Sequence, residues 1–489
     1  MRSLPYVGLA FLAQKLVLPS YAHTDNATTA YSSACNQIQH AVSSASAVYF
    51  PGDAQYVEDI NHWALSSIQE AECSVEPGTA WDVAAIIKIV GSTRTPFAIK
   101  GGGHASNPGF SSTTGVQIFM TRFSNVTYNA TSGTATIGMG LIWDDVYAAL
   151  EPHGVNVVGG RSTGVGVAGF SLGGGYSWKT NQFGLTLDSI TEFELVKPNG
   201  EIVQVNAQSD ADLFFGLRGG GNNFGIVTHI TMKTHPQSQV WGGFMIYTED
   251  QIPAVSSAIA AFCANVTDPK AAMINTVSYT MNTTLLVSLM FYDEPNQPVG
   301  IFDDFLKIPA LEANVSTQSF LSLLQGTPSS ADARAYFDTV SLLEYTPSMI
   351  AAIVNESTFW GTALTPSSGT FISYAIEPFL PTLYTHGSNS AYPPERVNPG
   401  YSPLNLYYAW TDSAFDGIID QTIKESSARL TSLAEAEGQS IQGAALYPNY
   451  ALAGTPLEKL YGGNLERLRE IRERVDPGGV MGLAGGWRF

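Results

Sequence analysis

The sequence is short of charged residues and of cysteine, and both shortages exclude classes of protein. Only 13% of the 489 residues are charged, and 23 Lys+Arg against 42 Asp+Glu leave a formal net charge of −19. A chain with no basic cluster is not expected to bind nucleic acid. Three cysteines are too few for a disulfide scaffold or a cysteine-rich zinc module, so no metal site is expected.

Long apolar runs are also missing. Beyond residue 22 no stretch reaches the roughly 18 consecutive apolar residues of a membrane span. The chain is nevertheless 44% hydrophobic, with 24 Phe, 22 Tyr and 8 Trp. That supply of apolar side chains excludes intrinsic disorder and is enough for a sizeable core. The length allows two or three domains.

The N-terminus has the pattern of a secretory signal over residues 1–22. Arg2 precedes an apolar run from Leu4 to Ala13, and Ser20-Tyr21-Ala22 offers a cleavage site. Lys15 interrupts the pattern, and a buried N-terminal helix is the alternative. We expect a secreted or secretory-lumen protein that is N-glycosylated. Seven Asn-X-Ser/Thr sequons agree with this, against about four expected by chance: Asn26, Asn125, Asn129, Asn265, Asn282, Asn314 and Asn355.

The three cysteines then divide into a pair and a single residue. Cys35 and Cys73 flank an N-terminal segment, and in an oxidising compartment they would form a disulfide. Cys263 would remain unpaired. Three unpaired buried thiols are the alternative if the chain is not secreted.

Periodicity predicts several helices and strands. Thr79 as N-cap and apolar residues on one face predict a helix that Gly91 ends, and a second stripe predicts a helix over 465–475. Short strands are expected at 96–99, 116–120, 126–128 and 135–137. Alternation over 371–377 and 404–410 predicts strands of an antiparallel sheet, with Tyr374 and its i±2 neighbours on one face.

Three glycine clusters stand out, at 101–103, 159–175 and 219–225. Such loops leave backbone N–H groups free and close to a ligand, an arrangement that holds a pyrophosphate without cations. The segment Gly164–Gly169 also matches G-x-G-x-x-G, with Asp188 at about the expected distance. A dinucleotide fingerprint must open a helix, however, and Gly173-Gly174-Gly175 would break it within two turns. We therefore do not expect a Rossmann nicotinamide site.

These strings together resemble the FAD-linked oxidases of the berberine-bridge-enzyme-like group, in the vanillyl-alcohol-oxidase superfamily with its PCMH-type FAD domain. The similarity is to the fungal members that modify secondary metabolites. In order and spacing, the matching strings cover most of residues 35–480. They are 98–104, 159–175, 212–227, 447–450, 461–464 and Asp476-Pro477.

The resemblance implies an α+β fold: a two-part PCMH-type FAD-binding domain and an antiparallel-sheet substrate domain backed by helices. On this basis we expect a signal peptide at 1–22 and an N-terminal segment of the FAD domain at 23–66. The PCMH-type domain would span 67–238 and the substrate-binding domain 239–440. A C-terminal segment, 441–489, would return to the FAD domain.

The resemblance also implies FAD as the cofactor and His104 as its covalent attachment point, at the flavin 8α-methyl carbon. Doubly tethered relatives use a cysteine where this chain has Ser162, so a single link is expected. The expected cofactor-binding residues are Lys100, Gly101, Gly102, Gly103, His104, Ser106, Gly160, Arg161, Gly166, Gly169, Gly173, Gly174, Gly221, Asn222, Gly225, Ile226, Val227 and Asn449.

A tyrosine or acidic base is expected above the flavin. Tyr447 is the first candidate, and Tyr450 and Glu377 follow. Tyr374 and Tyr408 are further candidates. For each of these tyrosines a core aromatic with a satisfied hydroxyl is the alternative. An ordinary phenol with a pKa of ~10 needs a nearby cation or hydrogen-bond donor to act as a base, and the sequence does not identify one.

The expected activity is oxidation of a small organic metabolite, with hydride passing to flavin N5 and the electrons then passing to O₂ to give H₂O₂. The expected partners are thus a small-molecule substrate and O₂, with no nucleic acid and no membrane span. Oligosaccharide oxidation, a non-redox cyclase that keeps the flavin, and a secreted flavoprotein with a binding role are the alternatives. Nothing in the sequence indicates the oligomeric state.

Overall fold

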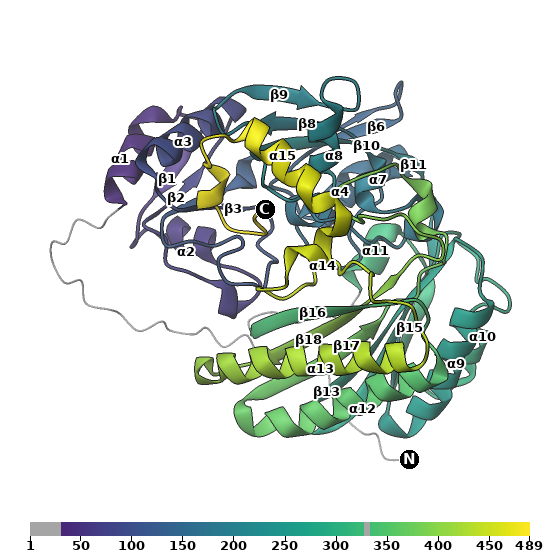
Figure 1. Cartoon of the computed structure of the whole chain (residues 1–489). Coiled ribbons are helices and arrows are strands. Elements are labelled where there is room, and N and C mark those ends of the chain that lie inside the picture. Colours follow the sequence, from purple (N-terminus) through teal and green to yellow (C-terminus); the bar gives the residue numbers. More distant parts are fainter. Residues whose placement is uncertain (1–30, 327–332) are drawn as a thin grey trace, which may run out of the picture.

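The computed structural model describes residues 31–326 and 333–489 as two lobes (Figure 1). The expected signal peptide and the Asn26 sequon lie outside these residues. The upper lobe contains a four-stranded and a five-stranded sheet, and the lower lobe a seven-stranded sheet backed by long helices. The predicted α+β architecture, with an antiparallel-sheet domain backed by helices, is confirmed.

The four-stranded sheet has the order β1-β2-β4-β3. Its strands are β1 (Ala47–Tyr49), β2 (Cys73–Glu76), β3 (Phe97–Lys100) and β4 (Val116–Phe119). Helix α3 (Ala80–Thr93) connects β2 to β3, and Thr79 caps it by accepting a hydrogen bond from the Asp82 N–H. The helix runs two residues past the predicted end at Gly91, because Arg94 takes the left-handed conformation that closes it.

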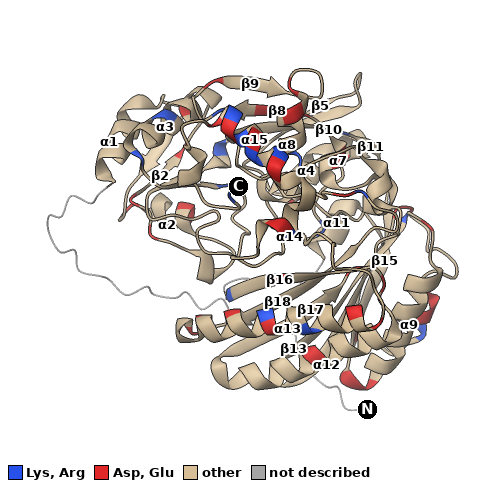
Figure 2. Cartoon of the chain, viewed as in Figure 1, with Lys and Arg blue, Asp and Glu red and all other residues tan. Residues whose placement is uncertain are grey.

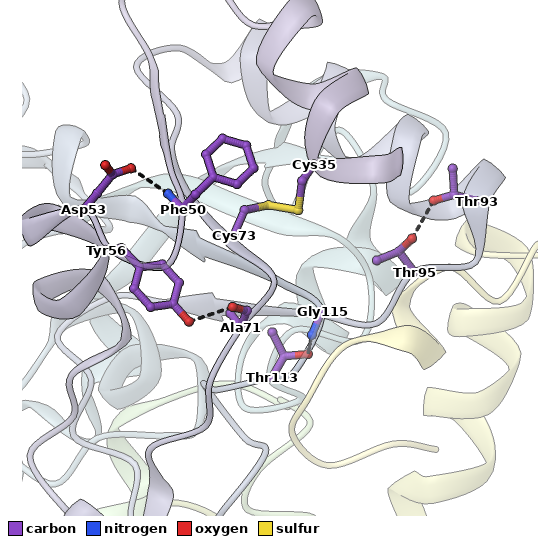
Figure 3. The surroundings of a disulfide bond; sticks show 10 residues. All are labelled: Cys35, Phe50, Asp53, Tyr56, Ala71, Cys73, Thr93, Thr95, Thr113 and Gly115. Carbon is purple, nitrogen blue, oxygen red and sulfur yellow. Dashed lines mark hydrogen bonds between the residues drawn. A yellow bond between two sulfur atoms is a disulfide. The ribbon is translucent and has the colours of Figure 1, made fainter. Parts of the chain in front are cut away.

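A disulfide joins the first helix to this sheet. Helix α1 (Ser32–Ala41) packs against α3, and Cys35 on α1 is bonded to Cys73 on β2 (Figure 3). Both sulfurs lie in a core with Val83, Ile86 and Val116. The predicted pairing is confirmed, and Cys263 is the unpaired cysteine among the described residues.

The five-stranded sheet is antiparallel, in the order β5-β6-β10-β8-β9. Its strands are β5 (Val126–Asn129), β6 (Thr134–Gly138), β8 (Ile190–Val196), β9 (Ile202–Val205) and β10 (Ile226–Lys233). The other elements of this lobe are α2 (Ala54–Ile60), α4 (Trp143–Leu150), β7 (Val155–Asn156), α5 (Val167–Leu172), α6 (Thr180–Phe183), α7 (Thr186–Ser189), α8 (Ala211–Leu217) and β11 (His235–Pro236).

The G-x-G-x-x-G segment does not form a dinucleotide fold. The preceding strand, β7, has two residues and pairs antiparallel with β11, and the helix that follows, α5, has only six residues. The side chain of Asp188, at the position of a ribose-binding acid, is buried in an ion pair with Arg396, at 2.6 Å between Oδ1 and Nη2. The geometry agrees with the exclusion of a Rossmann site.

The seven-stranded sheet has the order β15-β12-β14-β13-β17-β18-β16, with every pair antiparallel. Its strands are β12 (Val240–Tyr247), β13 (Ala271–Thr280), β14 (Thr283–Tyr292), β15 (Glu312–Gln318), β16 (Arg334–Leu342), β17 (Gly369–Ile376) and β18 (Ser402–Trp410). The helices of this lobe are α9 (Ile252–Asn265), α10 (Asp303–Lys307), α11 (Phe320–Gln325), α12 (Pro347–Leu364) and α13 (Asp416–Ala436).

The two faces of this sheet have different surroundings. Helices α9, α12 and α13 cover one face, where Ile372, Tyr374 and Trp410 are buried against them. Ala272, Ile274 and other residues of the opposite face pack with the core of the upper lobe. We call this opposite face the inner face. Among the described residues, no helix is long and apolar enough to cross a membrane.

The chain returns to the upper lobe after α13. Helices α14 (Leu457–Tyr461) and α15 (Leu465–Val475) pack in the core of that lobe, and Ala484 forms a bridge to Phe97 on β3 (Figure 1, yellow). The apolar stripe of α15 is buried, as its period predicts, while Arg474 pairs with Asp210. The segment that follows α13 carries residues 447–450 to the boundary between the lobes.

Charged side chains are spread over both lobes (Figure 2). Many cations lie next to a carboxylate, as in the pairs Arg122–Glu76, Arg334–Asp416 and Arg467–Asp212.

Candidate active site between the lobes

The first two glycine clusters lie against each other. A Cβ on Gly102 would fall 2.5 Å from Gly166 Cα, and a Cβ on Gly166 would fall 2.4 Å from the Gly102 nitrogen. Gly101 lies similarly close to Ala168. Only glycine allows the loop after β3 and the loop before α5 to approach this closely. Two clusters that are separate in the sequence therefore form one site.

These loops carry backbone donors with no partner in the described part of the chain. No described residue accepts a hydrogen bond from the N–H groups of residues 101–106 or 159–163. Several of these residues, including Gly103, Gly159 and Gly160, are buried. Clustered, partly buried N–H groups suit the oxygens of a pyrophosphate. The residues present therefore fit the diphosphate of FAD.

The other predicted loop residues have mixed surroundings. The ammonium of Lys100 donates to the carbonyls of Glu58 and Asp59, and burial lowers its pKa to about 8. Ser106 is buried, and Ser162 is partly exposed. Gly169 lies in α5 with open space at its Cβ position, so no close contact requires glycine there.

The glycines at 173–175 lie close to other segments of the chain, including the C-terminal segment. A Cβ on Gly173 would lie 2.0 Å from the side-chain oxygen of Asn449, and one on Gly174 would lie 3.1 Å from the Tyr447 ring. Gly175 donates its N–H to the Tyr447 hydroxyl at 3.1 Å.

The third cluster also meets other parts of the chain. Gly221 donates its N–H to the Leu172 carbonyl, and Asn222 bonds Gly485. Gly225 approaches the Val196 carbonyl, and Ile226 and Val227 are buried at the start of β10. The Gly221 hydrogen bond joins this cluster to the end of α5, the helix that follows the second glycine loop.

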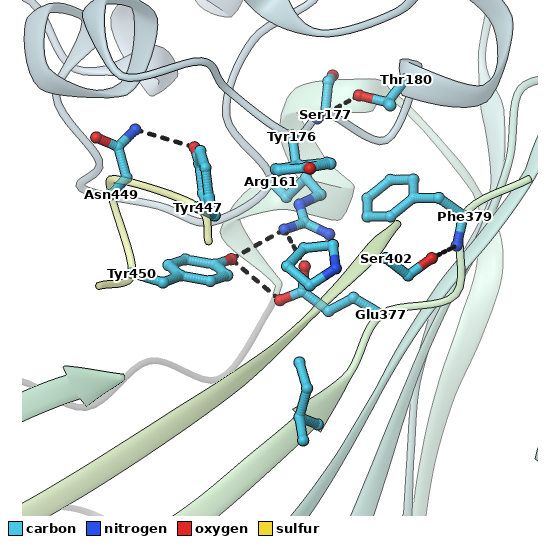
Figure 4. Close-up of polar contacts among 12 residues, drawn as sticks. Arg161, Tyr176, Ser177, Thr180, Glu377, Phe379, Ser402, Tyr447, Asn449 and Tyr450 are labelled. Carbon is cyan, nitrogen blue, oxygen red and sulfur yellow. Dashed lines mark hydrogen bonds and ion pairs between the residues drawn. The ribbon is translucent and has the colours of Figure 1, made fainter. Parts of the chain in front are cut away.

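A buried polar cluster forms where three elements meet. Arg161 Nη2 lies 2.6 Å from Glu377 Oε2 and 3.0 Å from the Tyr450 hydroxyl, which in turn donates to Glu377 Oε1 at 3.0 Å (Figure 4). Arg161 comes from the glycine loop, Glu377 follows β17 and Tyr450 lies in the C-terminal segment. The Arg161 and Glu377 side chains are only 7% and 4% exposed. We call these residues the Arg161–Glu377–Tyr450 triad.

Charge is balanced within the triad. Burial lowers the pKa of the Arg161 guanidinium, but the adjacent Glu377 carboxylate more than offsets this and raises that pKa, so Arg161 stays cationic. Burial, followed by the repulsion of Glu377, raises the pKa of the Tyr450 hydroxyl well above its ordinary value, while Arg161 lowers it. The Tyr450 hydroxyl is therefore protonated at ordinary pH.

Tyr447 has a different environment. Its ring is 2% exposed and meets Tyr176 edge to face, with 4.7 Å between centroids. Its hydroxyl accepts hydrogen bonds from the Gly175 N–H and from Asn449 Nδ2, at 2.9 Å for the latter. Burial raises its pKa to about 12, and these donors oppose that rise. These are the hydrogen-bond donors that the sequence could not identify.

Two of the candidate bases lie on the helix-covered face of the seven-stranded sheet, away from the inner face. Tyr374 and Tyr408 point toward the helices, where their hydroxyls bond each other, and Tyr374 also bonds Ser426 on α13. They are core aromatics with satisfied hydroxyls, as the alternative interpretation held, and they do not reach the boundary between the lobes.

His104 lies on an aromatic stack that the sequence did not indicate. Trp63 stacks on its imidazole at 4.2 Å with 14° between planes, and Phe337 of β16 stacks on Trp63 at 5.5 Å. Phe337 also contacts Tyr450, at 6.1 Å between centroids. Burial lowers the pKa of His104 to about 4, so the imidazole is neutral at ordinary pH.

Phe337 thus connects the His104 side of the site to the triad. Neither Phe337 nor Trp63 belongs to a motif. The one available signal was the alternation of β16, which places Phe337 and Tyr336 on different faces of the sheet. No group of three or more His, Cys, Asp or Glu among the described residues could hold a metal ion.

Comparisons with known proteins agree with this geometry. Residues 71–206 match the model of an FAD binding domain. An uncharacterized FAD-linked oxidoreductase of Arthroderma benhamiae is 33% identical over 392 residues, covering 77% of this chain and 78% of the relative. The FAD-dependent monooxygenase yanF of Aspergillus niger is 30% identical over 452 residues, covering 88% and 75%. The solved structure of Physcomitrella patens BBE-like 1 is similar in fold, with TM-score 0.75 at 20% identity, covering 91% and 97%.

Proposed function

The chain belongs to the FAD-linked oxidoreductases and has the fold of the berberine-bridge-enzyme-like proteins, and from this premise we propose that it is an oxidase of a small organic metabolite. The observation that carries the proposal is the position of the triad, with its phenol, carboxylate and guanidinium, beside the stack that holds His104. Groups that can take a proton thereby lie close to the expected attachment point of the flavin. We place the activity in fungal secondary metabolism, as the resemblance to that subgroup implies.

The chain's own residues would hold FAD through the loops that meet at Gly102 and Gly166. Their free N–H groups would bind the diphosphate, and His104 would carry the single covalent link. When bound, FAD supplies the acceptor for a hydride from the substrate. Ser162 stands near this site with a hydroxyl, which supports one link rather than two.

The base in this proposal is Tyr450 rather than Tyr447. Tyr450 is partly exposed, and its hydroxyl donates to Glu377, so Tyr450 would pass its own proton to Glu377 as it takes one from the substrate. Arg161 donates to Glu377 Oε2 and to the Tyr450 hydroxyl oxygen, and it would stabilise the negative charge on either group as the proton moves. Tyr447 is buried behind Tyr450, at 4.8 Å between ring centroids, and would support its position.

The substrate in this proposal is partly apolar. Phe337, Tyr407 and Phe371 line the inner face beside the triad, with 5.1 Å between the Phe337 and Tyr407 ring centroids. Aromatic walls with a few polar groups suit a small metabolite better than a long, fully hydroxylated saccharide. O₂ completes the cycle by reoxidising the cofactor.

The test is to purify the protein from a secretory host and precipitate it with acid. Yellow colour in the pellet, mapped to the peptide that contains His104, is expected. With a substrate found by screening, one H₂O₂ should appear for each O₂ consumed. Incorporation of ¹⁸O from ¹⁸O₂ into the product would instead favour monooxygenation, the activity named for the Aspergillus niger relative. Product formation without oxygen consumption would favour a cyclase.

We further propose that the protein enters the secretory pathway and is N-glycosylated. The asparagines of all six sequons in the described residues are exposed, and the Cys35–Cys73 disulfide is compatible with an oxidising compartment. Treatment with a glycosidase that removes N-glycans should lower the apparent mass of the secreted protein. An unchanged mass would remove this part of the proposal.

A further inference from the structure

The imidazole of His104 is held by stacking rather than by hydrogen bonds to other residues. Within the described residues it forms no hydrogen bond to another side chain or to another residue's backbone. Its nearest aromatic neighbour is Trp63, at 4.2 Å and nearly parallel, while Phe337 stacks at the longer distance of 6.4 Å. In most proteins a hydrogen bond on one imidazole nitrogen fixes the ring and its tautomer. Here the plane of the ring is set by Trp63.

Trp63 is itself fixed from both lobes. Its backbone N–H donates to the Gly103 carbonyl at 3.0 Å, directly beside His104. Phe337 of the lower lobe also stacks on the indole, at 5.5 Å with 7° between planes, and its ring lies 6.4 Å from the His104 imidazole. The residues that follow Trp63 run along the edge of β16, where the Leu65 N–H donates to the Ala333 carbonyl and Ser66 bonds Ala335.

We propose that Trp63 is a positioning residue for the covalent attachment of the flavin: it holds the His104 imidazole in the plane from which a ring nitrogen bonds the flavin 8-methyl carbon. This inference rests on the proposed function, which assigns the link to His104. In the attachment an N–C bond forms while a methyl C–H bond and the imidazole N–H bond break. The two electrons and two protons released pass to the flavin, and O₂ accepts them to give H₂O₂.

The physical basis is orientation. A partly buried ring with no hydrogen bond to another residue can rotate about its side-chain torsions, and each misplaced orientation lowers the rate of bond formation. Stacked aromatic pairs contribute enough beyond simple burial to change a rate by about threefold to tenfold. The low pKa of His104 acts in the same direction, because the neutral imidazole keeps its lone pair.

The experiment measures the rate of attachment separately from flavin binding. Protein expressed under riboflavin limitation is mixed with FAD, and the covalent adduct is followed by intact mass. The variants are Trp63→Leu, which removes the stack, and Trp63→Phe, which keeps a ring. The matched control is Trp81→Leu, at a tryptophan on α3 that is 77% exposed. FAD affinity is measured in a His104→Ala background, with and without Trp63→Leu.

The expected result is that Trp63→Leu slows attachment by about threefold to tenfold. Trp63→Phe should restore most of the rate, and Trp81→Leu should match the wild type. FAD affinity in the His104→Ala background should be unaffected by Trp63→Leu. Attachment in Trp63→Leu at the wild-type rate would overturn the inference and leave the proposed function intact. So would a loss of rate explained entirely by weaker FAD binding. A wild-type protein with no covalent flavin would overturn the proposed link and the inference with it.

Discussion

At the scale of single residues, Arg161 connects the two halves of the site. One of its nitrogens contacts both a carboxylate from the lower lobe and a phenol from the C-terminal segment. A buried cation is tolerated only when it is paired, and Glu377 supplies that pairing. Within the triad, Glu377 raises and Arg161 lowers the pKa of the Tyr450 hydroxyl.

Replacing Tyr450 by Phe should slow anaerobic flavin reduction by about 10²–10⁴-fold, because it removes the proposed base. Substrate binding should change little, since the ring remains. Tyr447→Phe should have a much smaller effect, because its hydroxyl only accepts bonds from Gly175 and Asn449. Rapid-mixing absorbance measures both rates, and Tyr374→Phe on the helix side is the control. A larger loss in Tyr447→Phe than in Tyr450→Phe would return the role to Tyr447.

The pH dependence of flavin attachment follows from the lowered pKa of His104. An ordinary imidazole with a pKa of about 6.5 would be about 97% protonated at pH 5 and would lose about thirtyfold in rate there. With a pKa of about 4, His104 stays neutral as pH falls from 8 to 5. The attachment rate measured by intact mass should therefore be nearly constant over this range. A steep fall centred near pH 6.5 would contradict the buried, neutral imidazole.

At the scale of structural elements, the contact between the two glycine loops is the tightest constraint on the cofactor site. Gly102→Ala would place a methyl group 2.5 Å from the backbone of Gly166, so one loop must move. We expect a loss of at least tenfold in FAD affinity, together with a destabilisation of about 1–3 kcal/mol.

Gly417→Ala is the matched control for this variant. Its Cβ position is open and lies in α13 of the lower lobe, so the substitution should leave FAD affinity unchanged. Titration with FAD and thermal unfolding compare the two variants. Equal FAD affinity for both variants would show that the close approach of the loops does not shape the site.

Local patterns were sufficient for much of the fold. The Thr79 cap, the stripe of α15 and the alternation of β17 and β18 each predicted the right element, because these signals are contained in a few neighbouring residues. Alternation also identified which residues share a face. It could not say which face meets the helices, because a period of two is the same from either side.

The candidate site was predictable only where a motif carried it. His104, Arg161 and the tyrosines at 447 and 450 lie in recognisable strings, and the structure brings them to one region. Trp63 and Phe337 reach it through packing between segments far apart in the chain, for which one sequence holds no signal. The sequence suggests a ligand loop at 173–175, and the structure places Gly173 against Asn449 and Gly174 against Tyr392 and Tyr447.

At the scale of the whole molecule, a buried ion pair joins the lobes. Lys179, which follows the glycine loops, is fully buried with its ammonium 3.4 Å from Asp293 at the end of the lower-lobe strand β14. Gln182 and Gln237 also donate to this carboxylate. The pair therefore fixes the inner face of the seven-stranded sheet relative to the upper lobe.

Asp293→Ala should destabilise the protein by about 3–5 kcal/mol, because it leaves a buried ammonium without a counter-charge. Lys179→Met should destabilise the protein less than Asp293→Ala does, because it removes the buried charge and keeps the side-chain volume. Asp293 also keeps its two glutamine donors in this variant. The control is Asp304→Ala in the exposed pair with Lys307, worth about 0–1 kcal/mol. Denaturant unfolding measures all three. A greater loss in Lys179→Met than in Asp293→Ala would contradict this account.

The return of the chain to the upper lobe has a consequence for synthesis. Residues 447–450 and α15 complete the core and the site of a lobe whose other strands leave the ribosome much earlier. The core of the upper lobe therefore stays incomplete, with the glycine loops and the partners of Tyr447 uncovered, until the lower lobe and the C-terminal segment have been translated. A ribosome that stalls within the lower lobe releases a chain with an unfinished core and no Tyr450. Catalytic competence is in this way tied to translation through the C-terminal segment.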